Sequence, residues 1–534
     1  MSFADLPSEL LGEVFLLVDG SYDYFGGDPY ALVHKFTLSH VCTAWRSTAL
    51  QLPLLWTHLY VKTDPDALML PTALTRSGSM PLDVRITWNS GGIFDRAIQN
   101  NDALIDALLA HRALLKRLTI DWVTKLPEAL TRLIGSGVEF PILEEIAARG
   151  VDKLPCKVDI SAPLRSLSLQ SQYYSEWESL LTPGLQRLEI DNCYPYLDAT
   201  RLQTIVFRAC PNLRELILHT GHVLYMSANL SNTPLQHLRS LSLSMMDTSV
   251  MVDILRTGFA HIVPEITTLV SDYSMNNEMK ALLAELLRGI TLTNLEFSWT
   301  HRLDLVDRDQ GMRRIISSWT AVAGEWNWRE LWAELASRNV NHTLRVLELS
   351  CVNWNEIIPA IAAHPLGAQD VDLVVELYGS SFDYKYTYND EVYSDDDDED
   401  NDDDDDYVDV DDDDNDNGNE SAQNEDEEEA PAPTPKPSRE RERFERELVP
   451  TPLNIPNLRR IVLTNSWYYT GDEENIPRVE FIGKILDAIS SDAATIEVCV
   501  SGAGLEEERE PVSVSAYAEQ HLKGKWTLCS HCLS

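Results

Sequence analysis

The chain contains one closely spaced group of side chains that could bind a metal ion. Cys529 and Cys532 form a C-x-x-C pair with His531 between them, and thiolate and imidazole groups are common zinc ligands. A structural zinc site needs four ligands, and no second C-x-x-C pair occurs in the sequence. The other cysteines are scattered singly, which is typical of reduced, buried thiols rather than a disulfide framework. We therefore expect no metal site and no cofactor.

Motifs of covalent catalysis are also missing. The sequence has no G-x-S-x-G elbow, no glycine-rich phosphate loop and no H-E-x-x-H, and its 13 histidines show no recurring spacing with acidic residues. Paired carboxylates carry no information in a chain with 85 Asp and Glu residues. His40 lies close to Cys42, but packing within a helix explains this pair better than nucleophilic catalysis does. We expect a protein without catalytic residues.

The charge of the chain limits its partners. The formal net charge is −42, which excludes ordinary binding to nucleic-acid backbones because such binding needs clustered Lys and Arg. Residues 395–429 hold 23 of the 85 acidic residues and no basic residue. The N-terminus lacks the pattern of a signal peptide, and no stretch approaches the length of a membrane span. The acidic charge indicates either basic partners or a solubilising tract. We expect a cytoplasmic or nuclear protein that does not enter a membrane.

Apolar residues near the N-terminus recur at helical spacing. The first set predicts a helix with Asp5 as its N-cap and Pro7 in its first turn, and it comprises Leu10, Leu11, Val14, Phe15 and Val18. A second set predicts another helix that ends before Pro53, and it comprises Leu38, Val41, Cys42, Trp45 and Ala49. A domain of about sixty residues buries only around 60% of its unfolded surface. A partner or the following domain must therefore cover the remaining apolar side chains.

These two motifs together resemble an F-box, the helical module by which substrate receptors dock on the Skp-type adaptor of a cullin–RING ubiquitin ligase. The matching pattern is Leu-Pro-x-Glu-Leu-Leu from Leu6, then Val-Cys-x-x-Trp-Arg from Val41 and Pro-x-Leu-Trp from Pro53. One departure is the segment 19–28, which lengthens the first connection between helices, so only the two flanking motifs are carried over. The resemblance implies that the adaptor contacts Leu6, Pro7, Leu10, Leu11, Val14, Phe15, Val41, Trp45, Leu55 and Trp56.

After the strand pattern of Leu82–Trp88, the chain repeats units of the form Leu-x-x-Leu-x-Leu. Most neighbouring units begin at a spacing typical of leucine-rich repeats, in which each unit supplies one short parallel strand and a returning helix or loop. A generic α/β sheet protein is the alternative. The units begin at Leu115, Leu164, Leu185, Leu213, Leu238, Ile266, Leu292, Leu344 and Leu458, with Leu143-x-x-Ile146 as a weaker member.

Two interruptions divide the repeats. The first contains two apolar patterns at helical spacing, Ile315 to Val322 and Trp328 to Leu335, which predict an inserted helical pair. Packing into the core is the favoured role of this pair, and a recognition surface is the alternative. The second combines dense acidic charge, clustered prolines and low hydrophobicity, which together predict a disordered insertion. After it, residues 479–500 predict one further helix and strand.

The sequence thus predicts an α/β protein in which a helical F-box precedes an irregular leucine-rich-repeat solenoid. The expected segments are 1–62 for the F-box, 63–382 for the solenoid, 383–452 for the acidic insertion, 453–510 for the last repeats and 511–534 for a tail.

Strand geometry predicts where a solenoid of this kind would bind its client. The leucines face the core, so the residues between them and directly after them face the other side of the sheet. The position between the last two leucines comprises Thr119, Ser168, Glu189, Ile217, Ser242, Val270, Glu296, Glu348 and Val462. The position after them comprises Asp121, Gln170, Asp191, His219, Ser244, Ser298, Ser350 and Thr464. Acidic residues predominate, so we expect Glu189, Asp191, Glu296 and Glu348 to attract a basic or mixed-charge client segment.

Two hypotheses of function follow. In the first, the F-box resemblance implies a substrate receptor that docks on the Skp-type adaptor, and through it on cullin, while the repeats hold a protein substrate. In the second, the chain is an acidic leucine-rich scaffold or chaperone for basic proteins such as histones. The position of the acidic tract weakens the second hypothesis, because the tract interrupts the repeats and the chain begins with an F-box-like segment.

Overall fold

The computed structural model describes much of the chain, and everything below refers to that part. The described residues are 6–21, 31–88, 101–122, 132–133, 137–150, 160–170, 180–191, 206–219, 237–244, 246–270, 275–298, 302–318, 327–350, 354–367, 370–376, 450–464, 479–490, 496–501 and 526–528. None of the helices within these ranges is both long and apolar enough to cross a membrane.

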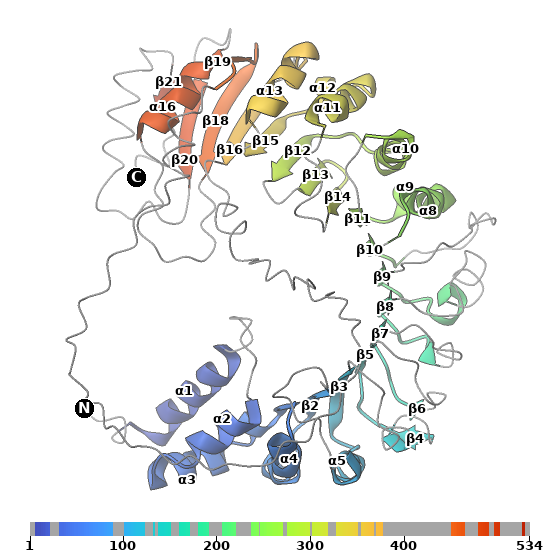
Figure 1. Ribbon diagram of the computed structural model, residues 1–534, viewed down its shortest axis with the longest axis vertical. Helices are drawn as coiled ribbons and strands as arrows, with labels where there is room; N and C mark the ends of the chain where they lie inside the picture. The colour runs from blue at the N-terminus through green and yellow to red at the C-terminus, as the bar shows by residue number, and fades with distance from the viewer. Residues whose placement is uncertain are drawn as a thin grey trace, which may run out of the picture. The chain divides into compact units, whose positions relative to one another are not determined.

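The chain divides into two compact units, which are described separately. The first comprises residues 1–348 with 363–369, and the second comprises residues 349–362 with 370–534. Helices and a large, mostly parallel sheet make up the fold (Figure 1). The expected α/β class is therefore confirmed.

The first unit begins with short helices. They are α1 (Ser8–Ser21), α2 (Ala31–Leu38), α3 (Thr43–Gln51) and the 3₁₀ helix η2 (Pro53–Trp56). Helix α1 extends to Ser21, so part of the expected long connection is helical, and residues 22–30 lie outside the described part. The single helix expected from Leu38 to Ala49 is wrong. Cys42 is extended (φ −156°, ψ 173°) and caps α3 by accepting from the Trp45 N–H at 3.5 Å, which starts a new helix after α2 has ended.

Parallel strands follow one another across the sheet of the first unit in chain order. Each strand pairs with the next one, β1 with β2 and so on to β11, through a register that aligns their apolar rows (Figure 1). The strands are β1 (His58–Val61), β2 (Leu82–Trp88), β3 (Leu115–Trp122), β5 (Glu145–Gly150), β7 (Ser166–Gln170), β8 (Arg187–Asp191), β9 (Glu215–His219), β10 (Ser240–Ser244) and β11 (Glu265–Val270). A separate small sheet pairs β4 (Val138–Glu139) with β6 (Ile160–Ser161).

The leucines of the motif form the core of this sheet, as expected from the sequence. Leu188, Leu216, Leu241 and Ile266 occupy equivalent positions in neighbouring strands, and all four are 0% exposed. A strand with one apolar row can bury it only against its neighbours and the segments that cover that face. The repeated spacing in the sequence therefore corresponds to a repeated strand in the structure.

The same pair of backbone hydrogen bonds recurs where these strands begin. The carbonyl oxygen of the residue after the first leucine of a repeat accepts from two successive N–H groups of the next repeat. The Gln186 oxygen, for example, accepts from the N–H groups of Arg214 and Glu215 at 2.7 and 2.9 Å, and the Arg214 oxygen accepts from those of Arg239 and Ser240 at 2.7 and 3.0 Å. The oxygens of Glu144 and Arg165 accept the same pair of bonds. This pattern holds successive repeats in one register.

Helices connect several of the strands. They are α4 (Asp64–Arg76), α5 (Asn101–Ala110), α8 (Thr248–Ile254), the π-helix η5 (Leu255–Phe259), α9 (Ala260–Ile262) and α10 (Asn277–Leu286). Side-chain caps fix where two of them begin. Thr63 and Asp66 form a capping box at α4, and the Asn276 carboxamide accepts from the Met279 N–H at 2.9 Å at α10.

The expectations for residues 292–344 are partly wrong. Strands β12 (Asn294–Ser298), β13 (Arg302–Asp307) and β14 (Met312–Ser318) form an antiparallel meander, and β14 pairs with β11 in parallel. The helix expected from Ile315 therefore begins as a strand, because Ile315 and Ile316 pair with β11 and β13. Trp319 lies outside the described residues. The second expected helix is confirmed as α11 (Trp328–Ser337), and α12 (Val340–Thr343) follows it.

The repeat expected at Ile266 and Leu269 has a different register. Val263, Ile266, Thr268 and Val270 are buried, whereas Leu269 is half-buried on the opposite face of the strand. A threonine therefore occupies a leucine position, and the Thr268 hydroxyl donates to the Ile315 carbonyl oxygen at 3.1 Å. Val270, expected on the open face, is 0% exposed. The apolar Leu269 side chain led the pattern into the wrong register.

The second unit repeats the parallel arrangement. Strands β16 (Val371–Glu376), β18 (Leu458–Thr464), β20 (Ile496–Ser501) and β21 (Trp526–Leu528) pair in that order, and β17 (Leu453–Asn454) pairs with β19 (Ile489–Ser490). The other elements are β15 (Val346–Ser350), which lies at the boundary of the units, α13 (Trp354–Ala363) and α16 (Val479–Ala488). The helix and strand expected after the insertion are thus confirmed, whereas residues 377–449 and the Cys529–Cys532 pair lie outside the described part.

We expect the stacked leucine row to dominate stability. Leu241→Ala removes a fully buried side chain and should lower the free energy of unfolding by about 3 kcal/mol, because a large-to-small core change leaves a cavity. The adjacent control, Ser242→Ala, changes the opposite face and should stay within about 0.5 kcal/mol. Urea unfolding monitored by circular dichroism measures both variants. Equal effects would contradict the assignment of these two faces.

Candidate partner-docking surfaces

Exposed apolar side chains concentrate near the N-terminus. Within the described residues, nine large apolar side chains are exposed, and seven of them lie between residues 10 and 54. These seven define the N-terminal apolar surface, which comprises Leu10, Leu17, Val18, Val33, Val41, Leu50 and Leu54. Leu10 and Leu17 are 54% and 71% exposed and are seven residues apart on α1, so they share one face of this helix. Apolar side chains exposed on one face of a helix are typical of a protein-binding site.

The structure divides the ten residues that the F-box resemblance assigns to the adaptor. Leu11, Phe15, Leu55 and Trp56 are buried by the chain itself, so they cannot present their side chains to a partner in this conformation. Pro7, Leu10 and Val41 are exposed, and the remaining three, Leu6, Val14 and Trp45, are half-buried. The apolar pattern could not separate the two groups, because both faces of α1 carry apolar residues.

The buried aromatic residues join the helices to the start of the sheet. The Phe15 and Trp45 rings meet edge to face with centroids 5.1 Å apart, and the Trp56 indole N–H donates to the Ala49 carbonyl oxygen at 2.8 Å. The Arg76 guanidinium, from the last turn of α4, lies 4.5 Å from the centroid of the Trp56 ring. Because cation–π and aromatic contacts of this kind favour one geometry, they orient the N-terminal helices against α4.

A buried lysine strengthens the same junction. Lys35 of α2 is 1% exposed, and its ammonium group donates to the carbonyl oxygens of Leu55 and His58 at 2.9 and 2.7 Å. These two carbonyl groups belong to η2 and to the first residue of β1. Lys35 therefore ties the helices to the first strand, and the N-terminal apolar surface has a defined position relative to that strand.

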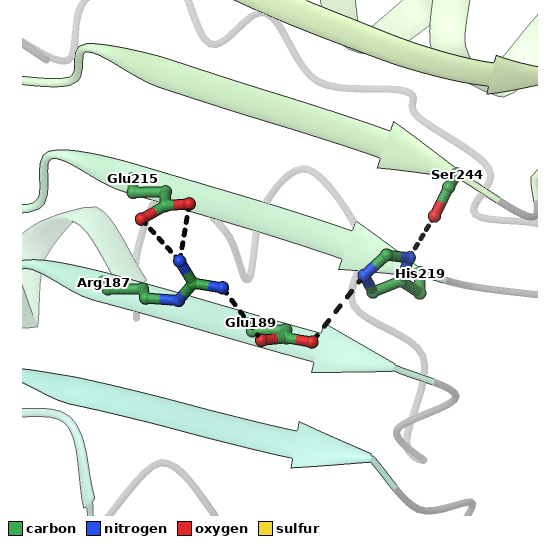
Figure 2. A network of polar contacts seen from close by, with 5 residues as sticks. All are labelled: Arg187, Glu189, Glu215, His219 and Ser244. Carbon is green, nitrogen blue, oxygen red and sulfur yellow. Dashed lines mark hydrogen bonds and ion pairs between the residues drawn. The ribbon is translucent and has the colours of Figure 1, made fainter. Parts of the chain in front are cut away.

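A second candidate surface is the open face of the sheet, defined here as the side opposite the leucines. Five polar residues form a chain of contacts across β8, β9 and β10 (Figure 2). Arg187 donates to both carboxylate oxygens of Glu215 at 2.8 and 2.9 Å and to Glu189 at 3.3 Å. The Glu189 carboxylate lies 3.8 Å from Nε2 of His219, and Nδ1 of His219 is in hydrogen-bond contact with the Ser244 hydroxyl.

This chain of contacts contains a serine, a histidine and an acid, but its geometry does not suit nucleophilic catalysis. Ser244 is 2% exposed, so a substrate has no access to its hydroxyl in this structure. The Glu189 carboxylate is also bound to Arg187, and 3.8 Å is too long for a hydrogen bond to His219. The contacts therefore connect neighbouring strands and give the open face a fixed polar surface.

The four acidic residues expected to bind a client differ in accessibility. Asp191 is 5% exposed, and burial raises the pKa of its carboxyl group, opposed by the charge of His219 and a hydrogen bond with Gln170. Glu189 is half-buried and engaged as described. Burial also raises the pKa of Glu296, which faces Asp304 across β12 and β13. Glu348 is half-buried on β15.

Charges alternate from strand to strand at the position directly before the second leucine of the motif, which the sequence analysis did not consider. Along neighbouring strands this position holds Asp83, Arg117 and Glu145, and the Arg117 guanidinium lies 3.4 Å from each carboxylate. Arg187 and Glu215 continue the alternation. The alternating signs at this position were visible in the sequence. The open face is consequently less acidic than the two positions considered earlier suggested.

No group of three or more His, Cys, Asp or Glu side chains within the described residues is arranged to hold a metal ion. Comparison of the chain with protein-family models found no match, and comparison with curated proteins found none either. A function for this chain therefore has to be inferred from its own residues.

The raised pKa of Glu296 predicts a pH-dependent gain in stability for Glu296→Gln. At neutral pH the folded wild type holds a carboxylate whose charged form is disfavoured by burial and by Asp304, so the neutral variant should have the higher melting temperature. As the pH falls through the raised pKa toward the ordinary value of 4.5, wild-type Glu296 becomes protonated and the difference should shrink. Thermal unfolding between neutral pH and the acid range measures it.

Asp372 provides a control with the opposite sign. Burial alone would raise its pKa, but hydrogen bonds from Arg459 and Arg460, at 2.6 to 2.8 Å, lower it below the ordinary value of 3.8. Its stabilising effect is present above that ordinary value and is lost as the pH falls through the lowered pKa. Asp372→Asn should therefore reduce the melting temperature at neutral pH. Shifts of the same sign in both variants would refute these environments.

Proposed function

We propose that this protein is the substrate-recognition subunit of a Skp–cullin–F-box ubiquitin ligase. Residues 1–62 form the F-box and dock on the Skp-type adaptor, which connects the chain to cullin. The following strands and helices form an irregular leucine-rich-repeat solenoid that holds a protein substrate. Other subunits transfer the ubiquitin, and this chain contributes no covalent chemistry. The protein acts in the cytoplasm or the nucleus.

The observation that carries this proposal is the N-terminal apolar surface. The F-box motif residues Leu10 and Val41 are among its exposed members, while the buried motif residues Phe15 and Trp56 pack the helices together. A partner that covers this surface would remove apolar area from water, and the free energy gained would drive docking. The motif therefore supplies both the packing and the contact residues that a helical docking module needs.

The repeated strands support the solenoid. Units in the first part of the chain add one parallel strand each, and the same pair of backbone hydrogen bonds recurs between them. In such a repeat the face opposite the leucines is a continuous surface that can bind an extended segment. The meander of β12 to β14 makes this solenoid irregular.

The alternative function, a scaffold or chaperone for basic proteins such as histones, draws less support from the open face. Its carboxylates are engaged by arginines, as Glu215 and Glu189 are by Arg187 and Asp304 is by Arg302. A basic client would have to compete with these arginines for the same carboxylates.

Adaptor docking is tested by comparing two exposed leucines. Leu10→Ala should weaken binding to a Skp-type adaptor by about 2 kcal/mol, as truncation of an interface anchor typically does. Leu68→Ala is the matched control, because Leu68 is also exposed, at 68%, but lies on α4 outside the F-box motif. It should leave the affinity unchanged. Isothermal titration calorimetry on the full chain measures both variants.

Absence of adaptor binding by the wild-type chain would refute the receptor assignment. Equal losses for Leu10→Ala and Leu68→Ala would place docking elsewhere than the F-box motif. Both variants change exposed side chains, so their folding should match that of the wild type, and circular dichroism checks this directly.

A further inference from the structure

Three exposed arginines lie in a row at the N-terminal ends of neighbouring strands in the first unit. Arg165, Arg214 and Arg239 each follow the first leucine of a unit and directly precede β7, β9 and β10. We call these three residues the basic rim. The equivalent residue before β8, which lies between β7 and β9, is Gln186. The basic rim therefore covers four consecutive strands.

The backbone holds this row in place. The carbonyl oxygens of Arg165, Gln186 and Arg214 each accept from two N–H groups of the next unit, as described above. Neighbouring strands are about 4.8 Å apart, so the arginines of β9 and β10 begin one strand spacing apart, and that of β7 begins two spacings away. The spacing of their charges is thus fixed by the sheet, although the side chains themselves extend into solvent.

Two arginines of the basic rim lack the ion pairs that other arginines of this sheet make, and the third makes only a long one. Arg117, Arg187 and Arg313 all contact carboxylates on neighbouring strands. Among the described residues, in contrast, the Arg214 and Arg239 side chains have no ion-pair or hydrogen-bond partner, and Arg165 has only Glu144 at 3.9 Å. Acidic residues outnumber basic ones by 85 to 43 in this chain. Two unpaired guanidinium groups, with a third that has one distant carboxylate, therefore form a local excess of positive charge.

We propose that the basic rim binds an acidic, extended segment of the client protein. This inference rests on the proposed function, because it names the chemistry of the client that the receptor would hold. A guanidinium group can donate two parallel hydrogen bonds to one carboxylate, and a row of guanidinium groups can therefore bind successive acidic side chains. A client contact at the rim also complements the open face, where the arginines are already occupied by the chain's own carboxylates.

The net charge of the chain favours a short acidic segment over a nucleic acid. Nucleic-acid binding draws on many phosphates at once and needs a large basic surface. The whole chain carries −42, so a long polyanion would be repelled outside the rim. A short peptide brings a few negative charges to the three arginines and extends less into the surrounding negative potential.

The test uses the full-length protein without the adaptor. The probe is a short fluorescein-labelled peptide of alternating Glu and Gly, and peptides with Lys or Gln in place of Glu are its controls. Fluorescence anisotropy is measured at low and at physiological salt for the wild type and for the double variant Arg214→Glu with Arg239→Glu. The matched control is Lys280→Glu with Arg329→Glu, which makes the same change in net charge at helical positions outside the rim.

The wild type should bind the Glu peptide alone, with an affinity that falls as salt rises. The rim double variant should lose about tenfold or more in affinity, because both direct contacts and local potential reverse. The helical control should lose much less. Thermal unfolding verifies that both variants fold.

Three outcomes would overturn the proposal. Equal losses in the two double variants would show that net charge, not the rim, governs binding. Single-stranded DNA that binds as tightly as the peptide and depends on the same arginines would make the rim a nucleic-acid site. Binding that is observed only after residues 395–429 are replaced by a neutral linker would assign the rim to the chain's own acidic tract.

The adaptor experiment and the peptide experiment test the receptor assignment and the basic rim separately. Loss of peptide binding alongside normal, Leu10-dependent adaptor docking would overturn only the basic rim. Peptide binding without any adaptor docking would leave the rim as a site for acidic segments and refute the receptor assignment.

Discussion

The structure of the first unit depends on one interaction: each strand buries a row of apolar side chains against the equivalent rows of the neighbouring strands. Leu216 is fully buried between the equivalent residues Leu188 and Leu241, and the strands that carry them are paired in one register. No single repeat can achieve this burial alone, because it has no neighbouring repeat to cover its apolar side chains. The same pairing sets the positions of the residues on the open face and at the basic rim. The packing of the core thereby determines the backbone position of each charged surface residue.

The strands could be predicted from the sequence because their signal is local and repeated. Leu-x-x-Leu-x-Leu places two apolar residues on one side of a strand, and almost every such motif is a strand in the structure. The signal failed where a polar residue took an apolar position. Thr268 is buried because its hydroxyl bonds to the Ile315 carbonyl oxygen, a partner far along the chain that no local pattern reveals. Ile315 itself carries a helical pattern but pairs with β11.

The candidate surfaces were less predictable than the fold, because they depend on which side chains remain uncovered. The F-box motif includes exposed Leu10 and buried Phe15, and their spacing on α1 gave no reason to separate them. The acidic residues of the open face present a similar difficulty. Glu189 looks available in the sequence, yet Arg187, two residues earlier, binds its carboxylate, and Glu215 comes from the next strand to bind the same arginine. Pairing across strands, not composition, decides the local charge.

The two surfaces proposed for this acidic chain differ in their chemistry. The proposed docking through Leu10 would draw on removal of apolar area from water, which moderate salt affects little. The proposed binding at Arg214 and Arg239 would draw on charge attraction between solvent-exposed groups, which salt screens over about 8 Å at physiological ionic strength. A receptor with both surfaces would hold its adaptor under conditions that release its client. The excess of acid elsewhere in the chain would sharpen this contrast, because it would repel polyanions while the three arginines of the basic rim would retain a short acidic segment.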